Sequence, residues 1–157
     1  MYRDCPLLEH NTAEVQRVFD IEKSASIGYF KGLSVWHITM TDRAQPRVFV
    51  VDDDVSVADT VTLVLCHFGF HVTTFYDPVL AVQHALLSAP DIVITDYSMP
   101  RMNGLELAAW LHNHSPHCKI VIITGEVAVV AAQENNGLKF TLLQKPVHPD
   151  VLLASIV

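Results

Sequence analysis

The chain has 157 residues, half of them hydrophobic, and a formal net charge of −7 at neutral pH. This length fits one domain with an additional segment, and the apolar content is high enough for a packed core. No apolar run approaches the roughly 20 residues that span a bilayer, and the polar first residues, MYRDCPLLEHN, do not read as a secretory signal. We therefore expect a cytoplasmic protein that has no membrane association.

The negative charge is concentrated after residue 45. Residues 46–157 hold five Lys or Arg and eleven Asp or Glu, which gives −6, whereas residues 1–45 are nearly balanced. An acidic domain is poorly suited to direct nucleic-acid binding, because phosphate contacts need a basic surface. It is better suited to hold a cation.

Residues 1–45 contain no motif that points to chemistry. Apolar residues at helical spacing permit a short amphipathic helix over 12–25, and the remainder has no clear period. We interpret residues 1–45 as an N-terminal extension of unknown role, partly helical or disordered, and residues 46–157 as the domain. Met40 stands shortly before the first strong strand pattern, so an alternative hypothesis makes it the natural start of the protein.

From residue 46 onward, strand and helix patterns alternate along the chain. The predicted strands are 47–51, 71–76, 91–95, 119–124 and 139–144. The predicted helices are 56–68, 78–88, 105–114, 127–135 and 149–157. Strands that read as continuous apolar runs between helices predict a parallel sheet covered on both faces, which is an open doubly wound α/β fold.

We single out polar residues at the ends of four of the five predicted strands. In a doubly wound sheet the carboxyl ends of the strands meet along one edge, where ligands bind. The residues are Asp52, Asp53 and Asp54 after the first strand, Asp96 after the third, Thr124 after the fourth and Lys145 after the fifth. No glycine-rich phosphate loop follows any strand, which argues against a nucleotide site.

These residue types together predict phosphoryl transfer onto an aspartate. Two carboxylates about 4 Å apart repel by about 4 kcal/mol at an effective dielectric constant of about 20, so the cluster needs raised pKa values or a cation. Oxygen ligands of this kind suit Mg²⁺, and a carboxylate can act as a nucleophile toward phosphorus. A cation, an ammonium group and a hydroxyl are the groups that neutralise a transferring phosphoryl group.

Four motifs at these strand ends resemble those of the receiver domain of two-component response regulators. They are VVDDD at 50–54, TDYSMPRMNG at 95–104, IITGE at 122–126 and LQKP at 143–146. Each motif is weak alone, but all four occur in the expected order. The resemblance implies that residues 46–157 form a flavodoxin-like sheet of five parallel strands in the order 2-1-3-4-5, with helices on both faces.

The resemblance also implies catalytic roles for three residues. Asp96 would be the phosphoacceptor. Lys145 would pair with Asp96 and then with the phosphoryl oxygens, and Thr124 would bond a phosphoryl oxygen and move on activation. The peptide bond between Lys145 and Pro146 is often cis in this family.

A magnesium site is the second implication of the resemblance, with Mn²⁺ as an alternative metal. Asp53 would be the direct ligand beside Asp96, Asp52 would act mostly through water, and the backbone carbonyl of Ser98 would be the third protein ligand. Asp54 has a different predicted role, as the N-cap of the helix 56–68.

Gly104 has a predicted role in the backbone. It is expected to permit a turn before the helix 105–114.

The expected function is phosphorelay signal transduction. The protein would take a phosphoryl group from a histidine kinase or a histidine phosphotransfer protein and then switch its contacts with an unknown downstream protein. It would turn over no separate substrate, although it would lose its own phosphoryl group by hydrolysis. Because the chain ends at Val157, we expect a stand-alone receiver.

Two positions depart from the family pattern. Leu142 stands where many receivers have an aromatic switch residue, and Gly125 follows Thr124 where alanine or another small residue is usual. Leu142 keeps open an alternative, a degenerate receiver that acts as a phosphorylation-independent interaction module. A more distant alternative is a flavodoxin-like cofactor binder, which the acidic strand ends disfavour because they would repel the cofactor's phosphate.

Overall fold

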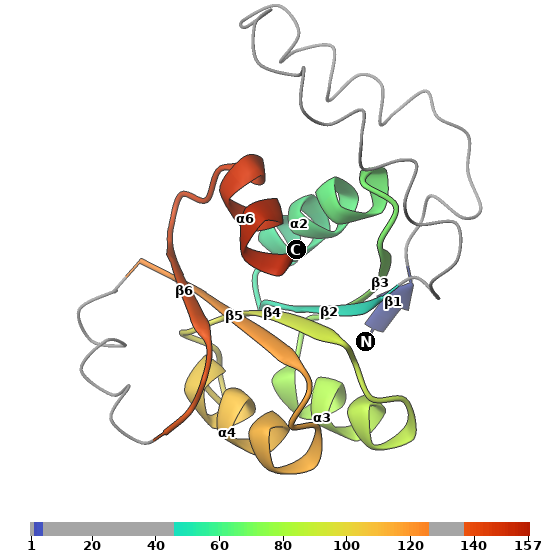
Figure 1. The fold of residues 1–157 in the computed structure, drawn as a ribbon, viewed down its shortest axis with the longest axis vertical. Helices are drawn as coiled ribbons and strands as arrows, with labels where there is room; N and C mark the ends of the chain where they lie inside the picture. The colour runs from blue at the N-terminus through green and yellow to red at the C-terminus, as the bar shows by residue number, and fades with distance from the viewer. Residues whose placement is uncertain (1, 5–45, 126–136) are drawn as a thin grey trace, which may run out of the picture.

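The structure is a computed structural model, and it describes residues 2–4, 46–125 and 137–157 (Figure 1). Two predicted helices, 12–25 and 127–135, lie outside the described residues, as does Met40. These expectations therefore stay predictions.

A six-stranded sheet forms the centre of the described part of the chain (Figure 1). Its strands are β1 (Tyr2–Asp4), β2 (Arg47–Val51), β3 (His71–Phe75), β4 (Ile92–Asp96), β5 (Lys119–Thr124) and β6 (Thr141–Gln144). They lie in the order β1-β3-β2-β4-β5-β6, and β2 to β6 are joined by parallel pairs. The predicted order 2-1-3-4-5 is thus confirmed for β2 to β6, and each predicted strand boundary holds to within two residues.

The prediction of five strands was incomplete, because β1 adds a sixth. It pairs with β3 in antiparallel fashion, with Tyr2 opposite Phe75 and Asp4 opposite Thr73. A three-residue segment has no hydrophobic period, so its strand conformation comes from the pairing with β3 and not from a local pattern. Part of the segment interpreted as an extension therefore belongs to the sheet.

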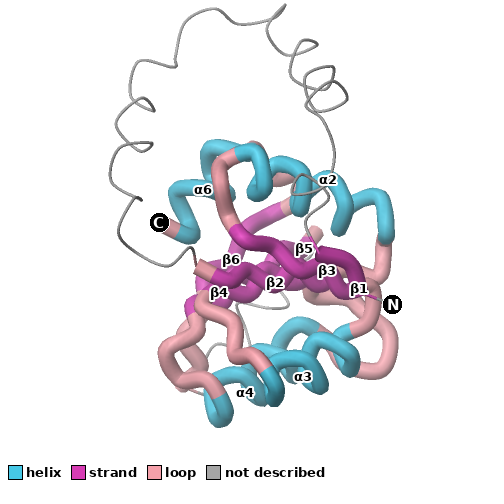
Figure 2. The backbone as a smooth tube through the Cα atoms, turned by 90° about the vertical axis from the view of Figure 1, so that its right-hand side faces the viewer, coloured by secondary structure: helices cyan, strands magenta, loops and turns pink. Residues whose placement is uncertain are grey.

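Four described helices cover the sheet in two layers (Figure 2). They are α2 (Val55–His67), α3 (Pro78–Leu87), α4 (Gly104–His114) and α6 (Pro149–Ile156). Helices α2 and α6 pack on one face and α3 and α4 on the other. These four predicted helices are confirmed to within one residue at each end, and none of them is long and apolar enough to cross a membrane.

Side chains at the start of each helix fix where it begins. The Asp54 carboxylate accepts hydrogen bonds from the backbone N–H groups of Ser56 and Val57, which confirms it as the N-cap of α2. Asp77 caps α3 in the same way, and Asn103 forms a capping box with Glu106 at α4. These caps set the positions of the loops that follow β2, β3 and β4.

Alternating side chains of the central strands fill two separate cores. Residues of the strands on the α2 and α6 side include Val48, Val50, Ile92, Ile94, Val121 and Ile123. Residues on the α3 and α4 side include Phe49, Val51, Phe75, Val93, Ile120 and Ile122. Strands buried on both faces form a rigid support for the residues at their carboxyl ends.

Candidate functional site

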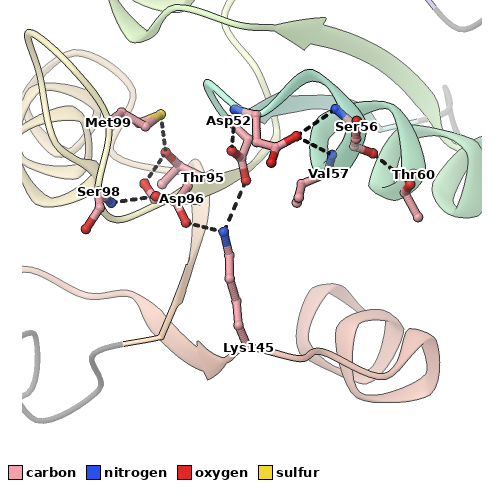
Figure 3. Close-up of polar contacts among 10 residues, drawn as sticks. Asp52, Ser56, Val57, Thr60, Thr95, Asp96, Ser98, Met99 and Lys145 are labelled. Carbon is pink, nitrogen blue, oxygen red and sulfur yellow. Dashed lines mark hydrogen bonds and ion pairs between the residues drawn. The ribbon is translucent and has the colours of Figure 1, made fainter.

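Three of the predicted site residues meet at the carboxyl edge of the sheet (Figure 3). Asp52 directly follows β2, Asp96 ends the neighbouring strand β4, and Lys145 follows β6. The Lys145 Nζ atom lies 2.5 Å from Asp96 Oδ1 and 3.4 Å from Asp52 Oδ2. The strand order therefore brings together residues that are up to 93 positions apart in the sequence.

Both carboxylates are held away from solvent. Asp52 is 6% exposed and Asp96 7% exposed, whereas Lys145 is partly exposed. Burial raises the pKa of Asp52 above its ordinary value, although the Asp54 amide and Lys145 oppose this shift. Asp52 is therefore an unfavourable place for a negative charge even with Lys145 close by.

Lys145 remains an ammonium group at this position. Burial by itself lowers the pKa of Lys145, but the hydrogen bond to Asp96 and the charges of Asp52 and Asp96 outweigh burial, so the net pKa is raised. One lysine nevertheless compensates only one of the two buried carboxylates.

Backbone groups orient the two carboxylates. The Ser98 N–H donates to Asp96 Oδ2 at 2.5 Å, and the Asp54 N–H donates to Asp52 Oδ1 at 2.9 Å. The Lys145 N–H donates to the Thr124 carbonyl at 2.9 Å, which fixes the backbone of Lys145 at the end of β5. The two carboxylates are thus held by the loops that follow β2 and β4, and the backbone of Lys145 is held by the last residue of β5.

Gly104 is needed for a close approach, and this corrects the expectation of a turn residue. A Cβ atom at Gly104 would lie 2.4 Å from the carbonyl oxygen of Asp96. The Gly104 N–H also donates to the Tyr97 carbonyl at 2.9 Å. Positive φ values occur at Gly69 and Gly137 and not at Gly104. The lack of space beside the Asp96 backbone is therefore what excludes a side chain at Gly104.

The loop between β4 and α4 is also held on its outer side. Arg101 has a φ of 69°, an uncommon value for a residue other than glycine, and its guanidinium forms an ion pair with Asp77. Sequence reasoning missed this pair, because no local spacing links a loop residue to the cap of another helix.

The remaining predicted residues lie at the same edge of the sheet. Thr124 is buried at the end of β5. Asp53 and Ser98 are exposed on the loops that follow β2 and β4. Asp54 caps α2, as expected, and the Lys145–Pro146 peptide bond is cis.

The donor chemistry of this edge fits a divalent cation. Within the described ranges, no three Asp, Glu, His or Cys side chains converge as a ready-made metal site. Mg²⁺ keeps several waters and needs only one or two carboxylates. Asp52, Asp53 and Asp96 carry three negative charges against the one positive charge of Lys145, so the local excess of −2 matches a divalent ion.

The two departures from the family pattern have simple structural settings. Leu142 lies in β6 opposite Ile122 and packs, half-buried, against the core on the α3 and α4 side. Gly125 is exposed, and a Cβ atom there would meet nothing within 4 Å. Neither position disturbs the contacts among Asp52, Asp96 and Lys145.

Comparison with known families matches residues 48–157 to the response regulator receiver domain. The relative DctD of Pseudomonas aeruginosa, a C4-dicarboxylate transport transcriptional regulatory protein, is 31% identical over 72% of this chain and 25% of its own length. The DNA-binding response regulator MtrA of Mycobacterium bovis is 32% identical over 73% of this chain and 50% of its own length. The chain therefore spans half or less of the length of these curated relatives.

Solved structures show the same fold. The chemotaxis protein CheY4 of Vibrio cholerae is 30% identical, with a TM-score of 0.65 over 72% of this chain and 97% of that one. An uncharacterized protein of Neptuniibacter caesariensis is 21% identical, with a TM-score of 0.68 over 73% of this chain and 87% of that one. The second likeness concerns the fold alone.

Proposed function

Since this chain belongs to the response regulator receiver domain family and hence to two-component signalling, we propose that it is a Mg²⁺-dependent phosphoacceptor that receives a phosphoryl group on Asp96. The observation that carries the proposal is the position of the Lys145 ammonium, 2.5 Å from one oxygen of a buried Asp96 carboxylate. This arrangement supplies an ordered nucleophile and a positive charge at the same oxygen.

The proposed step is a displacement at phosphorus. An oxygen of Asp96 forms a bond to the phosphorus atom as the bond from phosphorus to the donor breaks, and the donor leaves with the electron pair. The Lys145 ammonium stabilises the negative charge that develops on the phosphoryl oxygens. The Thr124 hydroxyl, at the end of the adjacent strand β5, donates a hydrogen bond to one of these oxygens.

Asp53, Asp52 and the Ser98 carbonyl would hold the cation. When bound, Mg²⁺ would neutralise the excess negative charge beside the acceptor. The fit rests on the oxygen-only donor set and on the local charge of −2, and Mn²⁺ suits the same donors.

The partners that fit this proposal are a histidine kinase or a histidine phosphotransfer protein as donor and a downstream protein as target. The names of DctD and MtrA describe those longer proteins. Two further expectations stay predictions: the absence of direct nucleic-acid contact and a cytoplasmic location. The acidic charge of the chain supports the first of them.

Labelling with acetyl phosphate tests the proposal directly. The full chain is incubated with acetyl phosphate, with and without Mg²⁺, and its intact mass is measured. We expect Mg²⁺-dependent addition of one phosphoryl group, none with Asp96→Ala, and retention with Asp54→Ala. The Asp54 side chain caps α2, and the backbone N–H that Asp54 donates to Asp52 is kept in alanine.

Two results would reject phosphoacceptance at this site. An unlabelled wild type would favour the degenerate receiver, a phosphorylation-independent interaction module. Equal labelling of Asp96→Ala and the wild type would place the phosphoryl group elsewhere.

A further inference from the structure

Each residue of β1 makes its own side-chain contact with the domain. The Tyr2 ring lies with its centroid 5.9 Å from that of Phe75 and 5.1 Å from that of His84. The Arg3 guanidinium lies 3.7 Å from Asp59 Oδ2. The Asp4 carboxylate accepts a hydrogen bond of 2.9 Å from the Thr73 hydroxyl.

These contacts hold β1 from both faces of the sheet. Successive side chains of a strand point to opposite faces, so Tyr2 meets His84 of α3 while Arg3 meets Asp59 of α2. The Tyr76 hydroxyl donates to the other oxygen of Asp59 at 2.6 Å and orients this carboxylate toward the edge of the sheet. The seat of β1 is therefore formed by residues of β3, α2 and α3.

Backbone pairing alone accepts almost any extended segment, so selectivity must come from side chains. The seat offers aromatic rings beside the first position, a carboxylate beside the second and a hydroxyl donor beside the third. We propose that the outer edge of β3 is a strand-docking site that selects an aromatic, a basic and an acidic residue in succession, and that residues 2–4 of the same chain occupy it.

Occupancy by the same chain follows from the tether. Residues 5–45 connect β1 to the domain, so the local concentration of the strand exceeds that of a second copy in dilute solution. The docked strand covers the backbone groups of β3 that would otherwise form an open sheet edge, which is a template for pairing with another chain. The docked strand therefore prevents a second copy of the chain from pairing with this edge of β3.

A charge-swap experiment on the full chain tests the selectivity. The Phe75 carbonyl accepts a hydrogen bond from the Asp52 N–H on the β2 side. Backbone groups of successive strand residues point in opposite directions, so those of Thr74 point toward β1. Amide hydrogen exchange of Thr74 is measured by NMR for the wild type, Arg3→Asp, Asp59→Arg and the double variant, with Val93 in the central strand β4 as the internal control.

Both single variants are expected to exchange the Thr74 amide roughly two- to fivefold faster, the factor that an exposed ion pair supports. The double variant should restore protection, since it rebuilds the pair with opposite polarity. Arg3→Lys should stay close to the wild type. Unchanged Val93 exchange shows in each case that the fold persists.

The proposed selectivity would be overturned if Arg3→Asp left the exchange rate of the Thr74 amide unchanged. It would also be overturned if the double variant failed to restore the protection of this amide. Light scattering tests the occupant. A monomer with protected Thr74 supports docking by the same chain, whereas Thr74 protection that disappears when a dimer dissociates on dilution would overturn it.

Discussion

Asp52 and Asp96 are both more than nine-tenths buried, yet the single positive charge of Lys145 lies between them. Their convergence could be predicted, because parallel strands of known order bring their carboxyl ends to one edge. The Arg101–Asp77 ion pair could not be predicted, since it depends on how two loops fold against each other.

Neutralising Asp52 is expected to stabilise the metal-free protein at about pH 7. Burial raises the pKa of Asp52 from 3.8, so the folded state holds this proton more tightly than the unfolded state. The stability from this group is fully present below the ordinary pKa and is lost as the pH rises through the raised pKa. Asp52→Asn should thus gain most at neutral pH, by about 3 °C in Tm for each 1 kcal/mol, and nothing near about pH 4.

Thermal unfolding of the wild type and Asp52→Asn across this pH range measures the difference. An advantage of the variant that does not change with pH would contradict the assigned cause. Asp54→Asn is a matched control, because asparagine also caps helices and Asp54 is exposed.

Removing the charge of Lys145 is expected to destabilise the fold. Loss of one partner from a buried ion pair costs about 3–5 kcal/mol, and the partial exposure of Lys145 reduces this to about 1–2 kcal/mol for Lys145→Met. The raised pKa of Lys145 means that this contribution is present below its ordinary pKa of 10.5 and is lost as the pH rises through the raised value.

Urea unfolding at neutral pH checks the size of the Lys145 effect. Lys145→Arg keeps the positive charge and should retain most of the stability. If Lys145→Met unfolds at the same urea concentration as the wild type, the ammonium does not compensate the buried carboxylates.

At the scale of secondary-structure elements, the hydrophobic pattern of the sequence predicted the strands and helices that bury apolar side chains in the two cores. Strands β2 to β5 are largely buried and rich in β-branched residues, whereas β6 is only partly buried. Helices α2, α3, α4 and α6 carry N-caps. Strand β1 has the sequence Tyr-Arg-Asp and three exposed residues, so only its tertiary pairing with β3 defines it.

The junction between β4 and α4 yields a test with a matched control. Gly104→Ala would push a methyl group into the Asp96 carbonyl and should cost about 1–3 kcal/mol, the usual range for overpacking. Gly125→Ala adds the same methyl group to open space beside Thr124 and should change the unfolding free energy by less than about 0.5 kcal/mol.

Denaturant unfolding of both variants measures these costs, and acetyl phosphate labelling follows the consequence for Asp96. We expect slower labelling only for Gly104→Ala, because only this change displaces the Asp96 backbone. Similar losses in the two glycine variants would indicate a general loss of helix or loop stability instead.

For the whole molecule, the acidic balance of the domain leads us to expect that a bound cation stabilises the fold. Mg²⁺ at 100 times its Kd should raise the unfolding free energy by about 2.7 kcal/mol, because it binds the folded state alone. Thermal unfolding with and without Mg²⁺ measures the shift, with NaCl at equal ionic strength as the control. Asp53→Asn should reduce the shift, and an identical Tm with and without Mg²⁺ would argue against a metal site.

The topology described above also has an electrostatic consequence. Helices α2, α3, α4 and α6 each begin after the carboxyl end of a strand, so their N-termini all point toward the edge that holds Asp52 and Asp96. Aligned peptide dipoles place about half a positive charge at each helix N-terminus, and this field fades within the first turn. At α2, which begins three residues after Asp52, the backbone thereby supplies a fixed positive charge that no change of pH removes. Adding one more negative group beside this N-terminus is therefore expected to cost less than the number of carboxylates suggests.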